Sequence, residues 1–230
     1  SGPPVEREHI PFAMNLVATV QPRTVVELGT DAGDFYCALC RAVVATIQPT
    51  RRFGIGVWGE APTTDASGDE VLADLRAYHD PRYGWFSKLV QTPFDGAVTH
   101  FDDGSIDVLH VPRLRSYDAV RGVFDAWRPK LTQRGIVLLE GVRACAGDAG
   151  VRRAWKELAL RHPAFEFVHG DGLGVLAVCP DVAPAVRSIL DADKDDRCAV
   201  QRFFADLGGK AALDQRRVSY GRERPGLARA

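Results

Sequence analysis

The stretch of sequence that decides the fold is Glu27-Leu28-Gly29-Thr30-Asp31-Ala32-Gly33, called here the glycine turn (residues 27–33). It continues the β-rich run Thr24-Val25-Val26, which predicts a buried strand. It precedes residues 35–47, where apolar side chains recur at the four-residue spacing of a helix. Open α/β sheets bind ligands at such strand–helix turns, because glycine lets the backbone approach a ligand closely. The turn therefore predicts a ligand site at the carboxyl end of the first strand.

The spacing within the glycine turn narrows the kind of ligand. Its pattern, E-x-G-x-x-x-G, differs from the G-x-G-x-x-G fingerprint of dinucleotide sites. The acidic Glu27 and the wider spacing suit a ligand that lacks a pyrophosphate and carries an ammonium group on an amino-acid portion. The alternative is an ordinary strand–helix turn with helpful glycines, so the remaining sequence has to decide between the two.

The rest of the chain alternates apolar runs with helical stretches, which is typical of a parallel sheet covered by helices. Besides residues 24–28, strands are predicted at residues 52–58, 88–91, 106–111, 135–139, 165–168 and 173–178. Helices are predicted at residues 35–47, 70–78, 94–101, 117–127 and 151–161. We expect an α/β, Rossmann-like, doubly wound and mostly parallel seven-stranded sheet that ends in a C-terminal antiparallel hairpin. Residues 1–180 would form this domain, and residues 181–230 a helical extension packed on or trailing from it.

The composition is that of an ordinary soluble globular protein. The 230 residues include 29 Lys and Arg against 30 Asp and Glu, a formal net charge of -1, so there is no basic excess for nucleic acid or for a membrane surface. No apolar run approaches the roughly 20 residues that span a bilayer. Five cysteines form no even disulfide framework, which favours a reducing, cytoplasmic compartment. Ser1-Gly2 resembles the remnant of a removed tag and leaves open that the chain is a fragment of a larger protein.

Further motifs follow the glycine turn in a fixed order. With the turn itself they read Val25-Val26-Glu27-Leu28-Gly29-Thr30-x-x-Gly33, Val57-Trp58-Gly59-Glu60, Tyr78-His79-Asp80-Pro81-Arg82-Tyr83-Gly84, Phe101-x-Asp103-Gly104-Ser105-Ile106-Asp107-x-Leu109-His110, Ser116-Tyr117-x-Ala119-Val120, Trp127-x-Pro129-Lys130-Leu131 and Phe165-Glu166-Phe167-x-His169-Gly170-x-Gly172-Leu173-Gly174-Val175-Leu176. Together they resemble a bacterial family of class I S-adenosylmethionine-dependent methyltransferases. Its members are often found beside or fused to glycosyltransferases and are related to sugar O-methyltransferases. The resemblance covers most of the chain.

This resemblance implies S-adenosylmethionine as the cofactor. The residues expected to bind it are Glu27, Gly29, Thr30, Gly33, Trp58, Phe94 and Asp95. The last two follow the third predicted strand, where this fold commonly meets the adenine, and the Asp95 carboxylate would accept a hydrogen bond from the adenine amino group.

The sequence departs from the family pattern at several functional positions. Relatives usually carry, at the position of Gly56, an Asp that binds the ribose hydroxyls, and losing this acceptor costs about 1–3 kcal/mol of binding. Relatives also carry an Asp and a second His after the fourth strand, where this chain has Pro112 and Arg115, and their fifth strand ends in His-Asp, where this chain has Glu140-Gly141. In the metal-dependent branch those carboxylates would hold a divalent cation. A hard cation needs several oxygen ligands, which the side chains of Pro112, Arg115 and Gly141 do not supply. We therefore expect no metal and regard the metal and catalytic motifs as degenerate.

Methyl transfer to a hydroxyl requires alignment of donor and acceptor and removal of the acceptor's proton. With the usual Asp and His replaced, the candidate catalytic residues are Glu140 and His110. The alternative for His110 is a structural, hydrogen-bonded role. The alternative for Glu140 is an ion pair with one of the arginines Arg113, Arg115 and Arg143.

Two smaller features have two interpretations each. Residues 78–85 are polar and aromatic and would either cover the cofactor and receive an acceptor sugar, or fold back as a loop on the sheet edge. Cys37-x-x-Cys40 has the spacing of a redox or metal pair, but it lies in an apolar helix and no second pair exists, so core packing is expected.

Two hypotheses about function follow. The first is a metal-independent methyltransferase acting on a small molecule, a hydroxyl of a sugar or related natural product, in glycan biosynthesis. The second is a catalytically inactive methyltransferase-like domain that serves as a binding or scaffolding module. The expected partners are a small-molecule substrate and, from the resemblance, a glycosyltransferase domain or partner. Neither nucleic acid nor a membrane is expected, and the sequence does not indicate an oligomeric state.

Overall fold

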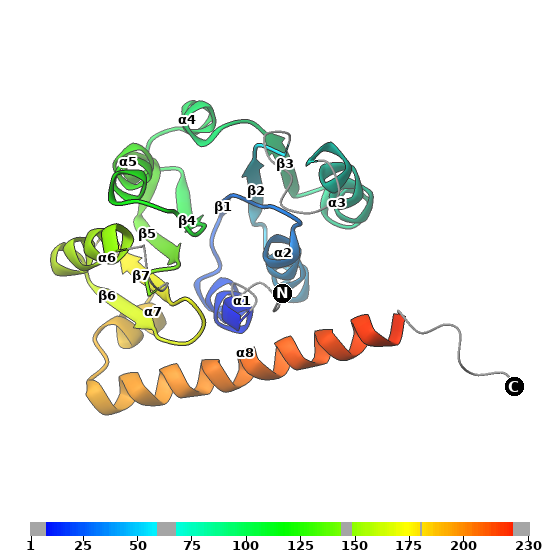
Figure 1. Cartoon of the computed structure of the whole chain (residues 1–230). Coiled ribbons are helices and arrows are strands. Elements are labelled where there is room, and N and C mark those ends of the chain that lie inside the picture. The colour runs from blue at the N-terminus through cyan, green and yellow to red at the C-terminus, as the bar shows by residue number, and fades with distance from the viewer. Residues whose placement is uncertain (1–7, 59–67, 144–148, 180, 223–230) are drawn as a thin grey trace, which may run out of the picture.

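The computed structural model describes residues 8–58, 68–143, 149–179 and 181–222, with side chains up to residue 211. Its centre is a seven-stranded sheet with the strand order β3-β2-β1-β4-β5-β7-β6 (Figure 1). The strands are β1 (Thr24–Leu28), β2 (Arg51–Gly56), β3 (Ser87–Gln91), β4 (Ile106–Val111), β5 (Leu131–Glu140), β6 (Ala164–Phe167) and β7 (Leu173–Ala177). Pairing is parallel from β3 through β5, and β7 is antiparallel to both β5 and β6. The predicted fold, including its C-terminal antiparallel hairpin, is confirmed.

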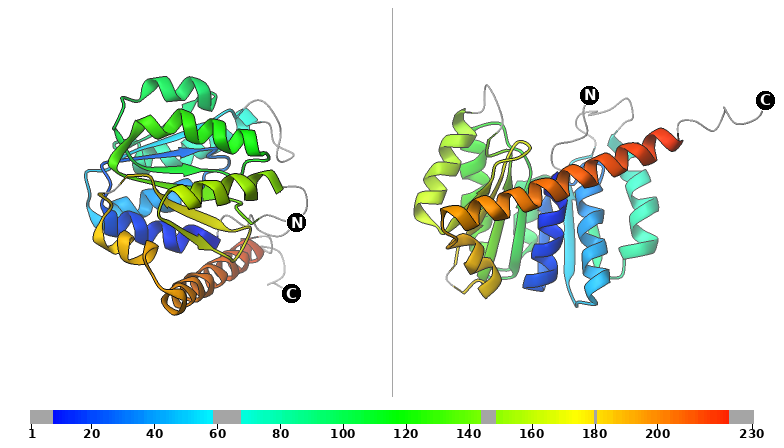
Figure 2. Two further views of the ribbon diagram at one scale, coloured as in Figure 1. Left: turned by 90° about the vertical axis from the view of Figure 1, so that its left-hand side faces the viewer. Right: turned by 90° about the horizontal axis from the view of Figure 1, so that it is seen from below.

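Helices cover both faces of this sheet (Figure 2). They are α1 (Ile10–Val20), α2 (Asp34–Thr46), α3 (Gly68–Tyr83), α4 (Phe94–Ala97), α5 (Tyr117–Trp127), α6 (Ala149–Arg161), α7 (Pro184–Leu190) and α8 (Lys194–Arg222), with 3₁₀ turns η2 (Val98–His100) and η3 (Arg128–Lys130). Side chains of α1, α2, α7 and α8 pack on one face, and those of α4, α5 and α6 pack on the other. None of the described helices combines the length and apolar character of a membrane span.

Alternation along the strands assigns each residue to a face. In β1, Val25 packs with α1 and α2, whereas Val26 and Leu28 pack with the helices of the opposite face. Glu27 therefore points toward α1 and α2. Its register partner His110 on β4 points the same way, because paired residues of neighbouring strands share a face.

Several elements differ from the sequence-based prediction; the helix predicted at residues 94–101, for instance, is the short α4 followed by η2, and the strand predicted at residues 52–58 ends at Gly56. Helix α1 was not predicted, although Phe12, Leu16 and Val20 are buried at four-residue spacing along it. Strand β5 begins at Leu131, four residues before the predicted start, and α3 continues through Tyr83 despite Pro81. The loop predicted at residues 59–69 lies almost entirely outside the described residues.

Two helices, α7 and α8, follow the sheet in the C-terminal tail. Helix α8 crosses the α1 side of the domain and runs on past it (Figure 1). Its first half is anchored by Phe204, whose ring lies 5.3 Å from that of Phe12 and 5.8 Å from that of Phe167.

Candidate functional site

The glycine turn has a backbone that only glycine accommodates at two positions. Gly29 and Gly33 have φ values of 68° and 81°. A Cβ on Gly29 would lie 2.7 Å from Cγ of Pro112, and one on Gly33 would overlap the Leu75 side chain. The Gly29 N–H donates to the Ile55 carbonyl at 2.7 Å, which ties the turn to β2. Sequence and packing thus agree that positions 29 and 33 of this turn must lack a side chain.

Two aromatic side chains border the turn at the carboxyl ends of the strands. The Trp58 indole N–H donates to the Asp31 carbonyl at 2.7 Å, and its ring lies against Gly56. The Phe94 ring approaches Gly29 from α4. The structure therefore brings Trp58 and Phe94 to the predicted cofactor position.

The remaining predicted cofactor residues differ in their surroundings. The Thr30 hydroxyl is buried and has no hydrogen-bond partner among the residues that the structure describes. Asp95 lies in the first turn of α4 with an exposed side chain. Glu27 is buried beneath the turn, where it contacts other charged groups.

Four charged side chains form a buried row on the α1 and α2 face, called here the buried charged row (Glu27, Arg52, His110 and Glu140). One Glu27 oxygen, Oε2, lies 3.3 Å from Arg52 Nη2 and 3.6 Å from His110 Nδ1. His110 Nε2 lies 3.5 Å from Glu140 Oε1. All four residues are at most 4% exposed. The Phe35 ring is stacked on His110, with ring centroids 4.2 Å apart.

His110 carries a charge within this row. Burial disfavours a charged imidazole, but the two carboxylates beside it, Glu140 and Glu27, raise the pKa of His110 to about 9. His110 is therefore protonated at neutral pH and, like Arg52, faces a carboxylate.

A second histidine reaches Glu140 from the segment before α1. His9 Nε2 lies 3.8 Å from Glu140 Oε2. Burial, together with His169 and His110, lowers the pKa of His9 to about 3. His9 is therefore neutral, and its contact with Glu140 is not an ion pair.

The structure thus joins the two predicted catalytic residues, Glu140 and His110, in one buried cluster. Two of the three arginines considered as partners of Glu140 have carboxylate contacts elsewhere. Arg113 pairs with Asp171 at 2.6 Å, and Arg143 pairs with Glu166 at 2.8 Å. The sequence-based reasoning missed Arg52 and His9, which no motif distinguishes from other residues of their segments.

A hydrogen-bonded chain continues from the row toward the amino ends of the strands. The Arg52 guanidinium lies 4.5 Å from the Tyr36 ring centroid. The Tyr36 hydroxyl and Ser87 Oγ are 2.5 Å apart, and Ser87 Oγ is 2.8 Å from His79 Nε2. His79 Nδ1 in turn lies 2.7 Å from Asp80 Oδ1. This order resembles a hydrolase triad, but Ser87 is 2% exposed, so the chain ties α2, α3 and β3 together and does not meet a substrate.

Residues 78–85 consequently lie at the end of the sheet opposite the glycine turn. They form the last turn of α3 and its exit toward β3, because α3 runs antiparallel to the strands. The expectation that they cover the cofactor is wrong, and so is the alternative of a loop, since most of the segment is helical. Cys37 and Cys40 are packed in the core beside this segment, as predicted.

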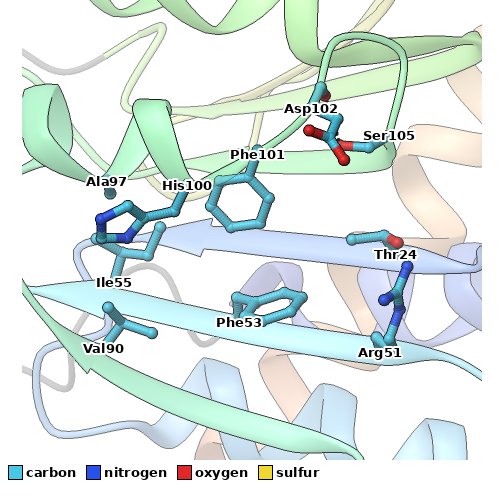
Figure 3. A pocket seen from close by; sticks show the side chains of 10 residues that line it. All are labelled: Thr24, Arg51, Phe53, Ile55, Val90, Ala97, His100, Phe101, Asp102 and Ser105. Carbon is cyan, nitrogen blue, oxygen red and sulfur yellow. Dashed lines mark hydrogen bonds between the residues drawn. The ribbon is translucent and has the colours of Figure 1, made fainter.

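A cavity of about 200 Å³ lies on the other face of the sheet (Figure 3). Phe53, Ile55 and Val90 form its apolar floor, and Thr24 and Arg51 mark its end at the amino ends of β1 and β2. It exists because the connection from β3 to β4 contains only the short α4 and η2 to cover these strands. The cavity is therefore separate from the glycine turn and from the buried charged row. No three described His, Cys, Asp or Glu side chains gather closely enough to hold a metal ion.

Comparison with known proteins assigns the family. Residues 26–141, which make up half of the chain, match a family model described as a methyltransferase domain. The chain belongs to this methyltransferase family. It is thus a class I S-adenosylmethionine-dependent methyltransferase domain, and the expected enzyme class and cofactor are confirmed.

Individual relatives agree with the fold. An uncharacterized Sinorhizobium fredii protein, y4gI, is 34% identical over 190 residues; these cover 81% of this chain and 21% of that protein, so the chain spans about a fifth of its relative's length. A Corynebacterium glutamicum protein aligns with a TM-score of 0.58 and 13% identity, covering 79% of this chain and 83% of the other. The O-methyltransferase TomG from Streptomyces achromogenes, solved in complex with S-adenosylmethionine, aligns with a TM-score of 0.53 and 18% identity. The alignment covers 75% of this chain and 80% of TomG. At these identities the solved structures show the fold alone.

Proposed function

We propose that this chain transfers the methyl group of S-adenosylmethionine to a hydroxyl of a small molecule, a sugar or related natural product, without a metal ion. The glycine turn carries this proposal. Within a methyltransferase fold it offers a bare backbone at Gly29 and Gly33, bordered by the Trp58 and Phe94 rings. Glycosyltransferase association and glycan biosynthesis rest on the sequence resemblance, and the greater length of the Sinorhizobium relative leaves room for other domains.

The residues at the turn fit S-adenosylmethionine. The buried Thr30 hydroxyl, which lacks a partner among the described residues, would hydrogen-bond its amino-acid portion, and Trp58 and Phe94 would flank the adenosine. When bound, the cofactor supplies an electrophilic methyl group on a sulfonium. Gly56 offers no carboxylate to the ribose. A Cβ added at Gly56 would lie 3.2 Å from atoms of the Trp58 ring. We therefore expect binding weaker by about 1–3 kcal/mol than in a relative with this carboxylate.

Metal independence is supported by the residues at the ends of β4 and β5. Pro112 packs on Gly29, and Gly141, with φ 76°, packs on the Arg113 side chain. Neither position supplies an oxygen ligand from a side chain, so the acceptor oxygen would be aligned by the protein alone.

The burial of His110 and Glu140 bears on their proposed roles. A general base must come within hydrogen-bond reach of the acceptor hydroxyl, and a protonated imidazole cannot accept its proton. Both side chains are covered in this structure, and His110 is charged at neutral pH. We therefore propose that they act by positioning other groups.

The second hypothesis, a binding module without catalysis, rests on the replacements at Gly56, Pro112 and Gly141 alone. Calorimetric titration with S-adenosylmethionine and S-adenosylhomocysteine, followed by transfer of labelled methyl to a panel of sugar and natural-product hydroxyls with and without EDTA, separates the two. Micromolar binding with EDTA-insensitive transfer supports the enzyme. Binding without transfer to any acceptor favours the module, and absence of binding at millimolar cofactor overturns the proposal.

A variant pair makes the binding test specific. Gly29→Ala places a methyl group against Pro112, whereas Gly122→Ala on α5 places one in open space. Loss of cofactor binding in the first variant, with full binding in the second, would locate the cofactor at the glycine turn.

A further inference from the structure

His110 contacts both carboxylates of the buried charged row through opposite sides of its ring. Nδ1 lies 3.6 Å from Glu27 Oε2, and Nε2 lies 3.5 Å from Glu140 Oε1. Glu27 is the first residue of the glycine turn, and Glu140 is the last residue of β5. The imidazole is therefore the group that connects the cofactor side of the proposed site with the end of β5.

We propose that His110 is a positioning residue of the methyl-transfer site, which holds Glu27 under the glycine turn and Glu140 at the end of β5 in a fixed relation to each other. The proposal rests on the proposed function in naming the site, but its geometry lies entirely within the described residues.

The charge on His110 supports this role. Arg52 and a protonated His110 face two carboxylates in a region that is almost fully buried. Without the charge on His110, the two carboxylates would lose the cation that lies between them, and their positions relative to each other would be less constrained. Of the groups that contact His110 or Glu140 from other elements, His9 from before α1 is neutral and Phe35 from α2 is apolar. His169, which follows β6, stacks on His9 with centroids 4.5 Å apart, and its pKa is also lowered, mainly by burial.

The strand that carries His110 also contacts the glycine turn directly. Two residues after His110, the Pro112 ring packs on Gly29 so closely that a Cβ there would lie 2.7 Å from it. A change in the position of β4 relative to Glu27 would therefore reach Gly29 through Pro112. This contact is the route by which the protonation of a buried imidazole affects the backbone that faces the cofactor.

Nuclear magnetic resonance tests the proposal without cofactor. In the full chain labelled with ¹⁵N, the His110 ring signals report its protonation, and the Gly29 and Gly33 amide signals report the conformation of the turn. We expect the two glycine signals to move with the same midpoint as His110, near pH 9. In His110→Gln we expect them to be displaced at neutral pH and not to follow this midpoint. Glycine signals that are unchanged in the variant and do not move with the His110 titration would overturn the proposal.

Calorimetry adds the functional consequence. We expect His110→Gln to bind S-adenosylmethionine about tenfold more weakly than the natural chain at neutral pH, a typical coupling between sites, and to show no further loss as the pH passes 9. His110→Lys, which restores a positive charge, should recover part of the affinity. The exposed His100→Gln on the other face is the matched control and should bind as the natural chain does. Equal affinity of His110→Gln and the control at every pH would contradict positioning.

The two measurements separate the proposals. If the natural chain binds no cofactor but its glycine signals follow His110, the proposed function fails and the positioning role of His110 stands. If the cofactor binds with unchanged affinity in His110→Gln and the glycine signals are unmoved, positioning fails and the proposed function stands.

Discussion

The strongest quantitative prediction concerns the dependence of stability on the protonation of His110. Its pKa is about 9 in the folded chain, against 6.5 for an unperturbed histidine. Because the folded-state pKa is the higher one, the stabilisation is fully present below pH 6.5 and is lost as the pH rises through 9. A shift of this size corresponds to about 3 kcal/mol, at about 1.4 kcal/mol for each pH unit of difference. The side chain is 6% exposed, so solvent screening reduces this figure little.

The assay is equilibrium unfolding by urea of the natural chain and of His110→Gln, at pH values from about 6 to about 10. Between roughly pH 7 and 8.5 the natural chain should lose about 1.4 kcal/mol of unfolding free energy per pH unit relative to the variant. The difference between the two curves should level off above about pH 9.5. Taking the difference removes the contribution of groups that titrate in both proteins.

Parallel curves for the natural chain and His110→Gln would refute the reasoning, since they would mean that His110 binds no extra proton in the folded state. His100→Gln, with an exposed histidine, provides the control and should parallel the natural chain throughout. A steep difference in that control would point to an effect of the overall charge.

Three further predictions concern other parts of the chain. His9 has a folded-state pKa of about 3, so its contribution to the unfolding free energy is complete above pH 6.5 and is lost as the pH falls toward 3. In His9→Gln the unfolding free energy should therefore decrease less steeply below about pH 6, by about 1.4 kcal/mol per pH unit. Gly29→Ala should lower the unfolding free energy by about 1–2 kcal/mol from its positive φ alone, whereas Gly122→Ala should raise it by about 0.5–1 kcal/mol in thermal denaturation. Burial acts to raise the pKa of Glu166, but the hydrogen bonds that its carboxylate accepts from Arg152, the Trp155 indole and Arg143 together outweigh burial and lower it. Glu166→Gln should cost about 1.5–3 kcal/mol at neutral pH, and the deficit measured by urea unfolding should shrink in acid.

The elements that could be predicted from sequence are those whose first and last residues are set by neighbouring residues in the chain. Strand β4 and helix α5 have the predicted bounds, because an apolar run between turns marks the first and the Ser116 side chain, accepting from the Ala119 N–H at 3.1 Å, caps the second. The start of β5 was missed because residues 132–134 are polar, two of them exposed, and a register shift separates this part from the rest of the ladder with β4. Helix α1 was missed because no glycine or polar loop signal separates it from the polar N-terminal segment.

The site divides in the same way. The glycine turn is a local pattern, and its glycines occupy the conformations that the pattern predicts. The buried charged row depends on register between strands far apart in sequence, which places His110 beside Glu27 and brings Arg52 across from β2. Tertiary structure therefore decides which carboxylate contacts Arg52 and which contacts His110. The sequence alone could only suggest candidate residues.

The strand order at the C-terminal edge of the sheet also constrains how the chain folds. Strand β6 precedes β7 in sequence but pairs only with β7, which stands between it and β5. During synthesis β6 therefore has no neighbour in this sheet until β7 has followed it, and the two strands would reach β5 together as a preformed hairpin. A chain that ends before Leu173 would lack β7, and β6 would then have no strand to pair with.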